Sequence, residues 1–265
     1  MSDDALRGTA PMVRYDVDVD AGRATLTFDS PHNRNALSAR LVAELLDGLA
    51  TATADDRVRA IVLTHTGNTF CAGADLGEAS AADPAVAADD RSRAIIEVLR
   101  ALLSTPKPVI AAIDGHVRAG GMGIVAACDI AVAGPSSSFA LTEVRIGVAP
   151  FMISLPLLPR LTARAASRYY LTGEKFGCEV AERIGLITVA AEDHGAEVAR
   201  LCAELRKGSP QGLAESKRLV NTATLAEFDA SAEELARRSA SFFGTPEAVE
   251  GITAFLQRRP ARWAQ

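Results

Sequence analysis

The chain has few aromatic residues, few cysteines and no long apolar run. Phe, Trp and Tyr make up only 5% of its 265 residues while 48% are hydrophobic, so a sizeable core must be built mostly from Ala, Val, Leu and Ile. The four cysteines lie far apart without a C-x-x-C pair, which argues against a disulfide framework and favours buried free thiols in a reducing cytosol. No stretch reaches the roughly 18 consecutive apolar residues of a transmembrane helix, so no membrane insertion is expected.

An excess of positive charge is also absent. The chain carries 28 Lys and Arg against 33 Asp and Glu, a formal net charge of −5. Because nucleic-acid binding depends on clustered positive charge, we expect no nucleic-acid partner. Residues 1–8 contain two aspartates and no apolar segment, so we expect no signal peptide and a cytoplasmic protein.

Hydrophobic periodicity predicts alternating strands and helices in the first part of the chain. Alternating apolar and polar residues in 13–19 and 24–28, separated by Ala21-Gly22, indicate a β-hairpin. Ser38 precedes one helical pattern, and Pro106-Lys107-Pro108 ends another. The remaining predicted segments are strands at 58–64, 109–113 and 130–133, a short helix that begins at Gly120, and an aperiodic Ala- and Asp-rich stretch at 79–90.

The C-terminal third has mostly helical patterns. Ser209-Pro210 and Thr245-Pro246 each match an N-cap followed by proline in the first helical turn. No internal repeat is evident. We therefore predict an α/β fold in which repeated β/α units form a core domain over residues 1–205, followed by a helical subdomain over 206–265.

Two glycine-bearing loops, residues 70–75 and 115–123, are the main candidates for a site. Small residues let the backbone approach a ligand closely and leave amide groups pointing outward. Amides of Ala74 and Gly120 that point at one oxygen would form an oxyanion hole, which stabilises the negative charge that develops on a carbonyl oxygen. Each loop alone could be only a tight turn, but the two together, each after a strand, favour a site.

A dinucleotide-binding site is a second interpretation of the later loop, because Gly121 to Ala126 fits G-x-G-x-x-A. Two observations argue against it. The next strand begins about seven residues after Gly123, whereas a crossover between parallel strands usually needs a dozen or more. The acid expected at the end of the second strand is also missing, since Asp129 opens that strand.

A set of short motifs follows a fixed order along nearly the whole chain. They are Asn35 to Ser38, Phe70 to Asp75, Lys107 to Ala112, Cys128 to Ile130, Phe139 to Gly147, Leu171 to Gly173 and Ala181 to Leu186. Together they resemble the crotonase family, the enoyl-CoA hydratase/isomerase superfamily of acyl-CoA enzymes. The resemblance implies a crotonase-type core, with the Ala74 and Gly120 amides as the oxyanion hole.

The resemblance also implies binding positions for coenzyme A, which would enter as part of the substrate and not as a permanently bound cofactor. They are Ala72, Ala74 and Leu76 around the adenine, Arg34 and Ala36 near the pyrophosphate, and Phe255 and Arg258 in the last helix, which would reach the coenzyme A of a neighbouring subunit. The family usually forms trimers or dimers of trimers. The helical subdomain is therefore expected to contribute to oligomerisation and to the coenzyme A site.

One acid of the family's hydratases is absent. These hydratases usually pair two glutamates; Glu143 matches the second, while the first falls at Gly123, which has no side chain. Family members with a single glutamate at the Glu143 position include double-bond isomerases, and some bacterial relatives called hydratases also carry glycine at the other position. Glu78 or the backbone would then have to aim the water for hydration.

The apolar neighbours of Glu143 predict partial burial and a raised pKa, as a general acid/base near neutral pH requires. A surface or capping carboxylate is the alternative, because Glu is usually exposed.

The sequence leaves the roles of several other side chains undecided. The bulky stretch Phe151 to Ser154 is expected to narrow or reshape the acyl pocket. Arg118 and Arg145 could bind an acidic acyl group, or could form a structural salt bridge to Asp114 or Asp129. The four histidines show no metal-ligand spacing, so no metal is expected.

The sequence therefore predicts an acyl-CoA-binding lyase of the enoyl-CoA hydratase type. Its oxyanion hole would stabilise a thioester enolate, and Glu143 would be the single acid/base. An enoyl-CoA double-bond isomerase is the alternative among enzymes. A binding protein that has lost turnover through Gly123 is the non-enzymatic alternative.

Overall fold

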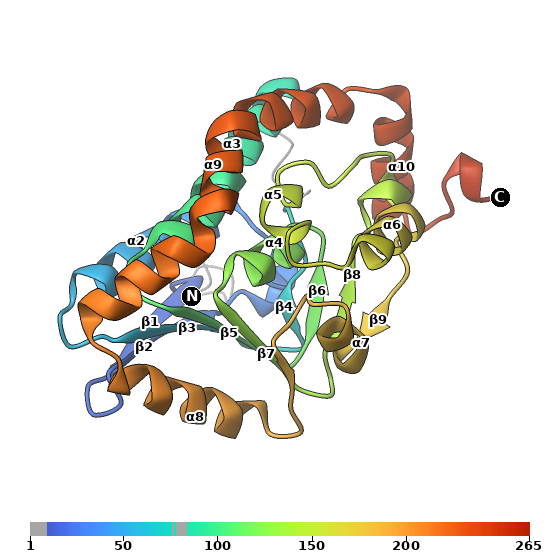
Figure 1. The fold of residues 1–265 in the computed structure, drawn as a ribbon. Helices are drawn as coiled ribbons and strands as arrows, with labels where there is room; N and C mark the ends of the chain where they lie inside the picture. The colour runs from blue at the N-terminus through green and yellow to red at the C-terminus, as the bar shows by residue number, and fades with distance from the viewer. Residues whose placement is uncertain (1–9, 76, 78–83) are drawn as a thin grey trace, which may run out of the picture.

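The computed structural model describes residues 10–75, 77 and 84–265, with the backbone alone for 84–88. Its named strands form two sheets, one of six strands and one of four (Figure 1). Helices cover both faces of the larger sheet, and the C-terminal helices continue beyond it along the upper and right edges of Figure 1.

The larger sheet contains the predicted strands. Its order is β1-β2-β3-β5-β7-β10. The hairpin is confirmed, since β1 and β2 pair antiparallel and Gly22 takes a φ of 63° at the turn. The other neighbours pair in parallel, as repeated β/α units require. The strands are β1 (Val13–Asp18), β2 (Arg23–Phe28), β3 (Ala60–His65), β5 (Val109–Ile113), β7 (Ile130–Ala133) and β10 (Val189–Ala190).

The smaller sheet was not predicted from the sequence. Its order is β4-β6-β8-β9, with β4, β6 and β8 parallel and β9 antiparallel to β8. Its strands have two or three residues each, which is too short to show a reliable alternation. They are β4 (Thr69–Cys71), β6 (His116–Arg118), β8 (Ser138–Ala140) and β9 (Phe176–Gly177).

The helices begin where the capping residues predicted. The side chains of Ser38, Ser209 and Thr245 each accept a hydrogen bond from the first turn of the helix that follows. The described α-helices are α2 (Ala39–Ala54), α3 (Pro84–Ser104), α4 (Gly120–Ala127), α5 (Ser154–Leu157), α6 (Ala163–Thr172), α7 (Cys178–Arg183), α8 (His194–Lys207), α9 (Pro210–Phe243) and α10 (Pro246–Leu256). Short 3-10 turns are η1 (Pro31–Asn33), η3 (Glu143–Ile146) and η4 (Arg262–Ala264).

The predicted start of the helix that precedes Pro106-Lys107-Pro108 was wrong, because this helix, α3, begins earlier than the sequence indicated. The aperiodic stretch 79–90 lies partly outside the described residues, but 84–90 form the first turns of α3. Proline is well tolerated at a helix start, and the alanines that follow have the highest helix propensity, so this part needs no apolar periodicity to be helical.

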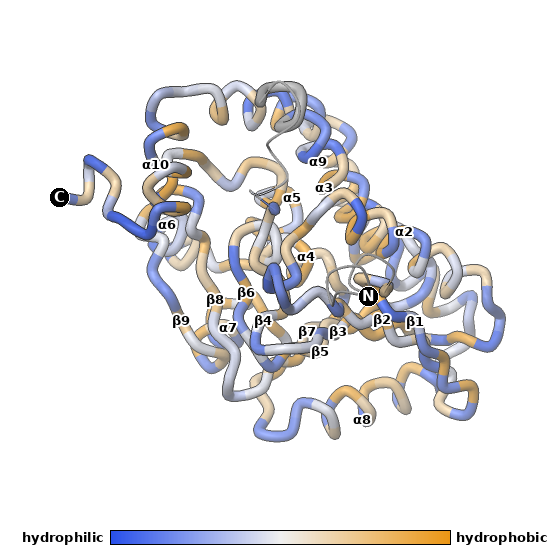
Figure 2. Tube along the Cα trace, turned by 180° about the vertical axis from the view of Figure 1, so that it is seen from behind, coloured by the Kyte–Doolittle hydropathy of each residue, from blue (hydrophilic) through white to orange (hydrophobic). Residues whose placement is uncertain are grey.

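Two apolar layers enclose the larger sheet. On one face α8 packs Val198 and Cys202 against Val62, Ile110 and Val132. The other face meets α2, α3 and α4 in the main core, which also reaches the smaller sheet. Figure 2 shows hydrophobic residues along α4 and hydrophilic residues between α10 and the C-terminus.

The long helix α9 lies along α3 (Figure 1). A buried ion pair joins its first half to the core, because Lys217 Nζ lies 2.7 Å from Asp129 Oδ2 and also donates to the Leu102 and Lys107 carbonyl oxygens. Asn221, one turn later, donates to Asp129 Oδ1 and to the Leu103 carbonyl. The division of the chain between residues 205 and 206 stays a prediction.

Candidate functional site

Three parallel strands of the smaller sheet end at the candidate site. β4, β6 and β8 are neighbours, and the last residues of β6 and β8, Arg118 and Ala140, pair with each other. The carboxyl ends of parallel strands lie at one edge of a sheet, and so do the residues that follow them. The unpredicted sheet thus directs Ala74, Gly120 and Glu143 to a common edge, one from each strand.

The loop after β4 is fixed against residues 34–37. The Ala72 amide donates to the Arg34 carbonyl at 3.2 Å, the Leu37 amide to Gly73 at 2.8 Å, and the Asp75 amide to Leu37 at 3.3 Å. Four of the positions expected around coenzyme A are thereby brought together. They are Arg34, Ala36, Ala72 and Ala74.

Asn35 holds this loop pair in place, a role that the sequence reasoning missed. Its buried side chain accepts from the Ser30 amide at 2.7 Å and donates to the carbonyl oxygens of Thr66 and Thr69 at 3.1 and 2.7 Å. Arg34 and Asn35 both have positive φ, 59° and 53°. Asn tolerates this conformation better than most residues, which was the available signal in the sequence.

The two glycine-bearing loops touch at Gly73. This residue has a φ of 91°, and a Cβ there would lie 2.8 Å from Ala119 Cβ and 3.3 Å from the Gly120 nitrogen. Only a residue without a side chain allows this approach. The predicted pairing of the two loops is therefore present.

The Ala74 and Gly120 amides are both unused. Across residues 10–75, 77 and 84–265, neither amide donates a hydrogen bond to the protein. Gly120 is buried at the first position of α4, after Ala119 with a φ of 46°. An unused amide at a helix start favours a negatively charged oxygen, and the unused Ala74 amide lies next to Gly73, which contacts Gly120. The pair can therefore act as an oxyanion hole.

Glu143 is buried as predicted, with 9% of its surface exposed. Its Oε2 atom has no hydrogen-bond partner. Burial disfavours the charged form and raises the pKa of Glu143 to about 7, although a hydrogen bond to its own backbone opposes the shift. A carboxyl group with this pKa can both accept and give a proton at neutral pH.

The space in front of Gly123 is filled by Ile153. A Cβ at Gly123 would lie 2.5 Å from Ile153 Cγ2 and 2.7 Å from Ile153 Cβ. The bulky stretch 151–154 thus reaches the position where the family's hydratases carry their first glutamate. A second carboxyl group cannot enter there unless Ile153 changes.

Arg118 and Arg145 do not form the salt bridges considered from the sequence. Arg118 donates to the Val117 and Ser138 carbonyls and to Ser138 Oγ. Asp129 is paired with Lys217, so it is not the partner of either arginine. Arg145 donates to the Thr172 carbonyl at 3.4 Å.

The remaining expected positions are not joined to this site. Leu76 and Glu78 lie outside the described residues. Phe255 is exposed in the last turn of α10, whereas Arg258, expected in the same helix, follows the end of α10 with a φ of 54° and is also exposed. None of their described contacts involves the loops at 34–37 and 72–75. Their role toward a neighbouring subunit stays a prediction.

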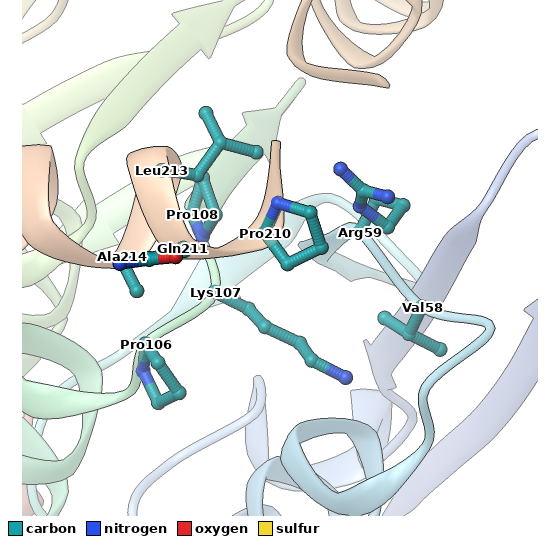
Figure 3. Close-up of a pocket in the computed structure, with 9 residues that line it drawn as sticks. All are labelled: Val58, Arg59, Pro106, Lys107, Pro108, Pro210, Gln211, Leu213 and Ala214. Atoms are coloured by element: carbon teal, nitrogen blue, oxygen red, sulfur yellow. The ribbon is translucent and has the colours of Figure 1, made fainter. Parts of the chain in front are cut away.

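A hollow of about 260 Å³ lies elsewhere, beside the first turn of α9 (Figure 3). Its basic side chains already have backbone partners, since Lys107 donates to Ala52 and Asp55 carbonyls and Arg59 to Gly208. In the part of the chain that is described, no three His, Cys, Asp or Glu side chains gather as a metal site. No described helix is both long and apolar enough to span a bilayer.

Two unused amides and a buried carboxyl group at one sheet edge define an α/β protein suited to proton transfer beside a carbonyl group. Comparison with known proteins gives the family. The family model for enoyl-CoA hydratase/isomerase matches residues 18–265. The chain is 30% identical over 237 residues to the 2,3-dehydroadipyl-CoA hydratase of Escherichia coli, with 88% of this chain and 92% of that protein covered.

Two further similar proteins carry names from the same family, one an isomerase and one a hydratase. The chain is 31% identical over 254 residues to the 1,2-epoxyphenylacetyl-CoA isomerase of Escherichia coli, covering 91% of this chain and 94% of that protein. The crystal structure of an enoyl-CoA hydratase from Mycobacterium avium aligns with a TM-score of 0.90 at 55% identity, covering 96% of this chain and 100% of that one. The chain belongs to the enoyl-CoA hydratase/isomerase family, which confirms the crotonase resemblance and the α/β fold.

Proposed function

We propose that this enzyme adds water to the double bond of a 2-enoyl-CoA, with Glu143 as the single acid and base. The observation that carries the proposal is the buried Glu143 carboxyl group at the sheet edge that also presents the unused Ala74 and Gly120 amides. Relatives called hydratases at 30% and 55% identity support the same choice.

One carboxyl group is sufficient for this reaction. The Glu143 carboxylate takes a proton from water while the water oxygen bonds to C3 of the enoyl group. The electron pair of the double bond moves into the thioester, where the Ala74 and Gly120 amides stabilise the carbonyl oxygen of the enolate. The Glu143 acid then gives the proton to C2, which restores the carbonyl group and the carboxylate.

The coenzyme A part of the substrate would bind along the joined loops. In this proposal Arg34 and Ala36 lie near the pyrophosphate, and Ala72, Ala74 and Leu76 near the adenine. We also propose a homo-trimer or dimer of trimers. Exposed apolar side chains near the C-terminus support a protein partner for this end of the chain: Val249, Phe255, Leu256 and Trp263.

Double-bond migration is the second candidate, and Ile153 favours it. An apolar side chain occupies the place of a second water-activating acid. Glu143 alone could remove a proton from C2 of a 3-enoyl thioester and return it at C4, or carry out the reverse transfer on a 2-enoyl thioester, without water.

A panel of enoyl-CoA thioesters tests these alternatives. Hydration adds the mass of one water and removes the conjugated-thioester absorbance, whereas migration leaves the mass unchanged. Turnover by hydration supports the proposal, and migration alone supports the second candidate. Tight binding of acyl-CoA without either reaction would make the chain a binding protein.

A further inference from the structure

A water that attacks C3 must be oriented through both of its protons. Glu143 accepts one of them in the proposed function, and the other needs a second acceptor near the same carbon. Gly123 supplies none, and Ile153 in front of it is apolar. The polar group next to Ile153 along the chain is Ser154.

Ser154 and Tyr170 form a short hydrogen-bond chain with a fixed direction. The Ser154 hydroxyl donates to the Pro150 carbonyl, which can only accept. The single proton of Ser154 is thereby used, so Tyr170 must donate to Ser154, at an Oη–Oγ distance of 3.1 Å. Tyr170 Oη keeps an unused lone pair and acts toward other groups as an acceptor only.

This chain lies beside the turn that carries Glu143. Arg145 of η3 donates to the Thr172 carbonyl near the end of α6, the helix that carries Tyr170. Gly173, which ends α6, approaches the Leu141 carbonyl so closely that a Cβ would lie 2.9 Å from it. The end of α6, η3 and the stretch 150–154 therefore converge, and Ser154 and Tyr170 are both half-buried residues.

We propose that Tyr170 is a positioning residue for hydration, whose Oη accepts the second proton of the water that Glu143 activates. The inference rests on the proposed function. In this arrangement the hydroxyl groups of Tyr170 and Ser154 help to orient the water, as the missing second acid would do. Glu143 alone transfers the protons.

Electrostatics agrees with this placement. Burial, and to a lesser extent the negative charge of Glu143, raises the pKa of Tyr170 to about 12, although its bond to Ser154 opposes the shift. Tyr170 thus stays protonated at neutral pH. Charged groups on the neighbouring elements are engaged elsewhere or exposed: Arg145 with Thr172, Arg168 with Glu174, and Glu247 on the surface of α10.

Tyr170→Phe removes the acceptor and keeps the ring. We expect hydration to fall by about tenfold to a hundredfold, the value of one hydrogen bond realised in the transition state. Exchange of the C2 protons of a saturated acyl-CoA in heavy water, and its binding constant, should stay within twofold, since they need no positioned water. Tyr169→Phe is the matched control, because the ring of Tyr169 packs on Phe176 in the core.

Ser154→Ala gives an independent signature. It frees the Tyr170 proton to turn toward Glu143, which would favour the carboxylate and move the acid limb of the hydration profile to lower pH. An acid limb that Ser154→Ala leaves unchanged, or a Tyr170→Phe enzyme that hydrates within twofold of wild type, would overturn the role of Tyr170 and leave the proposed function intact. A Tyr170→Phe enzyme that loses binding, exchange and hydration together would show a merely structural role. A wild-type enzyme without hydration would refute the proposed function and this inference with it.

Discussion

Gly123→Ala tests whether Ile153 closes the place of the second acid. The new Cβ would lie 2.5 Å from Ile153 Cγ2 and 2.7 Å from Ile153 Cβ, whereas unstrained carbon contacts lie at about 3.5–4.0 Å. Overpacking costs about 1–3 kcal/mol, and these contacts belong at the upper end because Cβ cannot rotate away. Replacing glycine inside α4 returns about 1 kcal/mol of helix propensity. The expected net loss of unfolding free energy is about 2 kcal/mol, or about 4–8 °C in Tm.

Thermal and denaturant unfolding at one fixed protein concentration measure this loss, since association would otherwise shift the midpoint. Gly195→Ala in α8 is the matched control. Its Cβ would meet Asp193 Oδ1 at an ordinary 3.4 Å, so no loss is expected.

A double-mutant cycle identifies Ile153 as the cause. Ile153→Ala keeps the Cβ contact and should relieve only part of the strain, whereas Ile153→Gly removes both contacts. We expect a coupling of at least about 1 kcal/mol between Gly123→Ala and Ile153→Gly. Gly123→Glu, with a larger side chain, should be tolerated only beside Ile153→Gly. A Gly123→Ala variant with unchanged stability, or equal losses in every Ile153 background, would refute the reasoning.

Three further predictions concern Glu143 and Asn35. Glu143→Gln should lower turnover by about 10²-fold to 10⁴-fold with acyl-CoA affinity little changed. Steady-state kinetics measure the turnover and calorimetry measures the affinity. Activity within a few-fold of wild type would show that Glu143 takes no part in the chemistry. Because the folded-state pKa of Glu143 is raised from 4.5 to about 7, its burial favours the protonated form. Wild-type stability relative to Glu143→Gln should therefore decline as pH rises from 4.5 to about 7 and then level off, whereas a constant difference would contradict the shift. Asn35→Ala should destabilise by about 2–4 kcal/mol, since it leaves the buried Ser30 amide and Thr69 carbonyl without this partner and removes one partner of the Thr66 carbonyl. Asn33→Ala, on the partly exposed neighbour, should cost less, and equal losses would count against the role of Asn35.

Periodicity and capping predicted five of the six strands of the larger sheet and most helices, because these segments are long enough to display a repeat; the two-residue strand β10 (Val189–Ala190) was not predicted. The smaller sheet escaped prediction because strands such as Thr69–Cys71 are three residues long and are defined by their partners. Its consequences were nevertheless anticipated through the glycine-bearing loops, which pointed to Ala74 and Gly120. Ile153 and Tyr170 could not be assigned in the same way, since their roles depend on where separate segments meet.

The three short parallel strands also bear on how such a site changes its chemistry. Each strand end carries one group on its own loop, and the strands are joined by backbone hydrogen bonds that do not depend on side-chain identity. A substitution after β8 can replace the proton carrier while the amides after β4 and β6 keep their positions. In the proposed function, the groups that stabilise the charge and the group that carries the proton follow different strands, so a change of reaction would require no new fold.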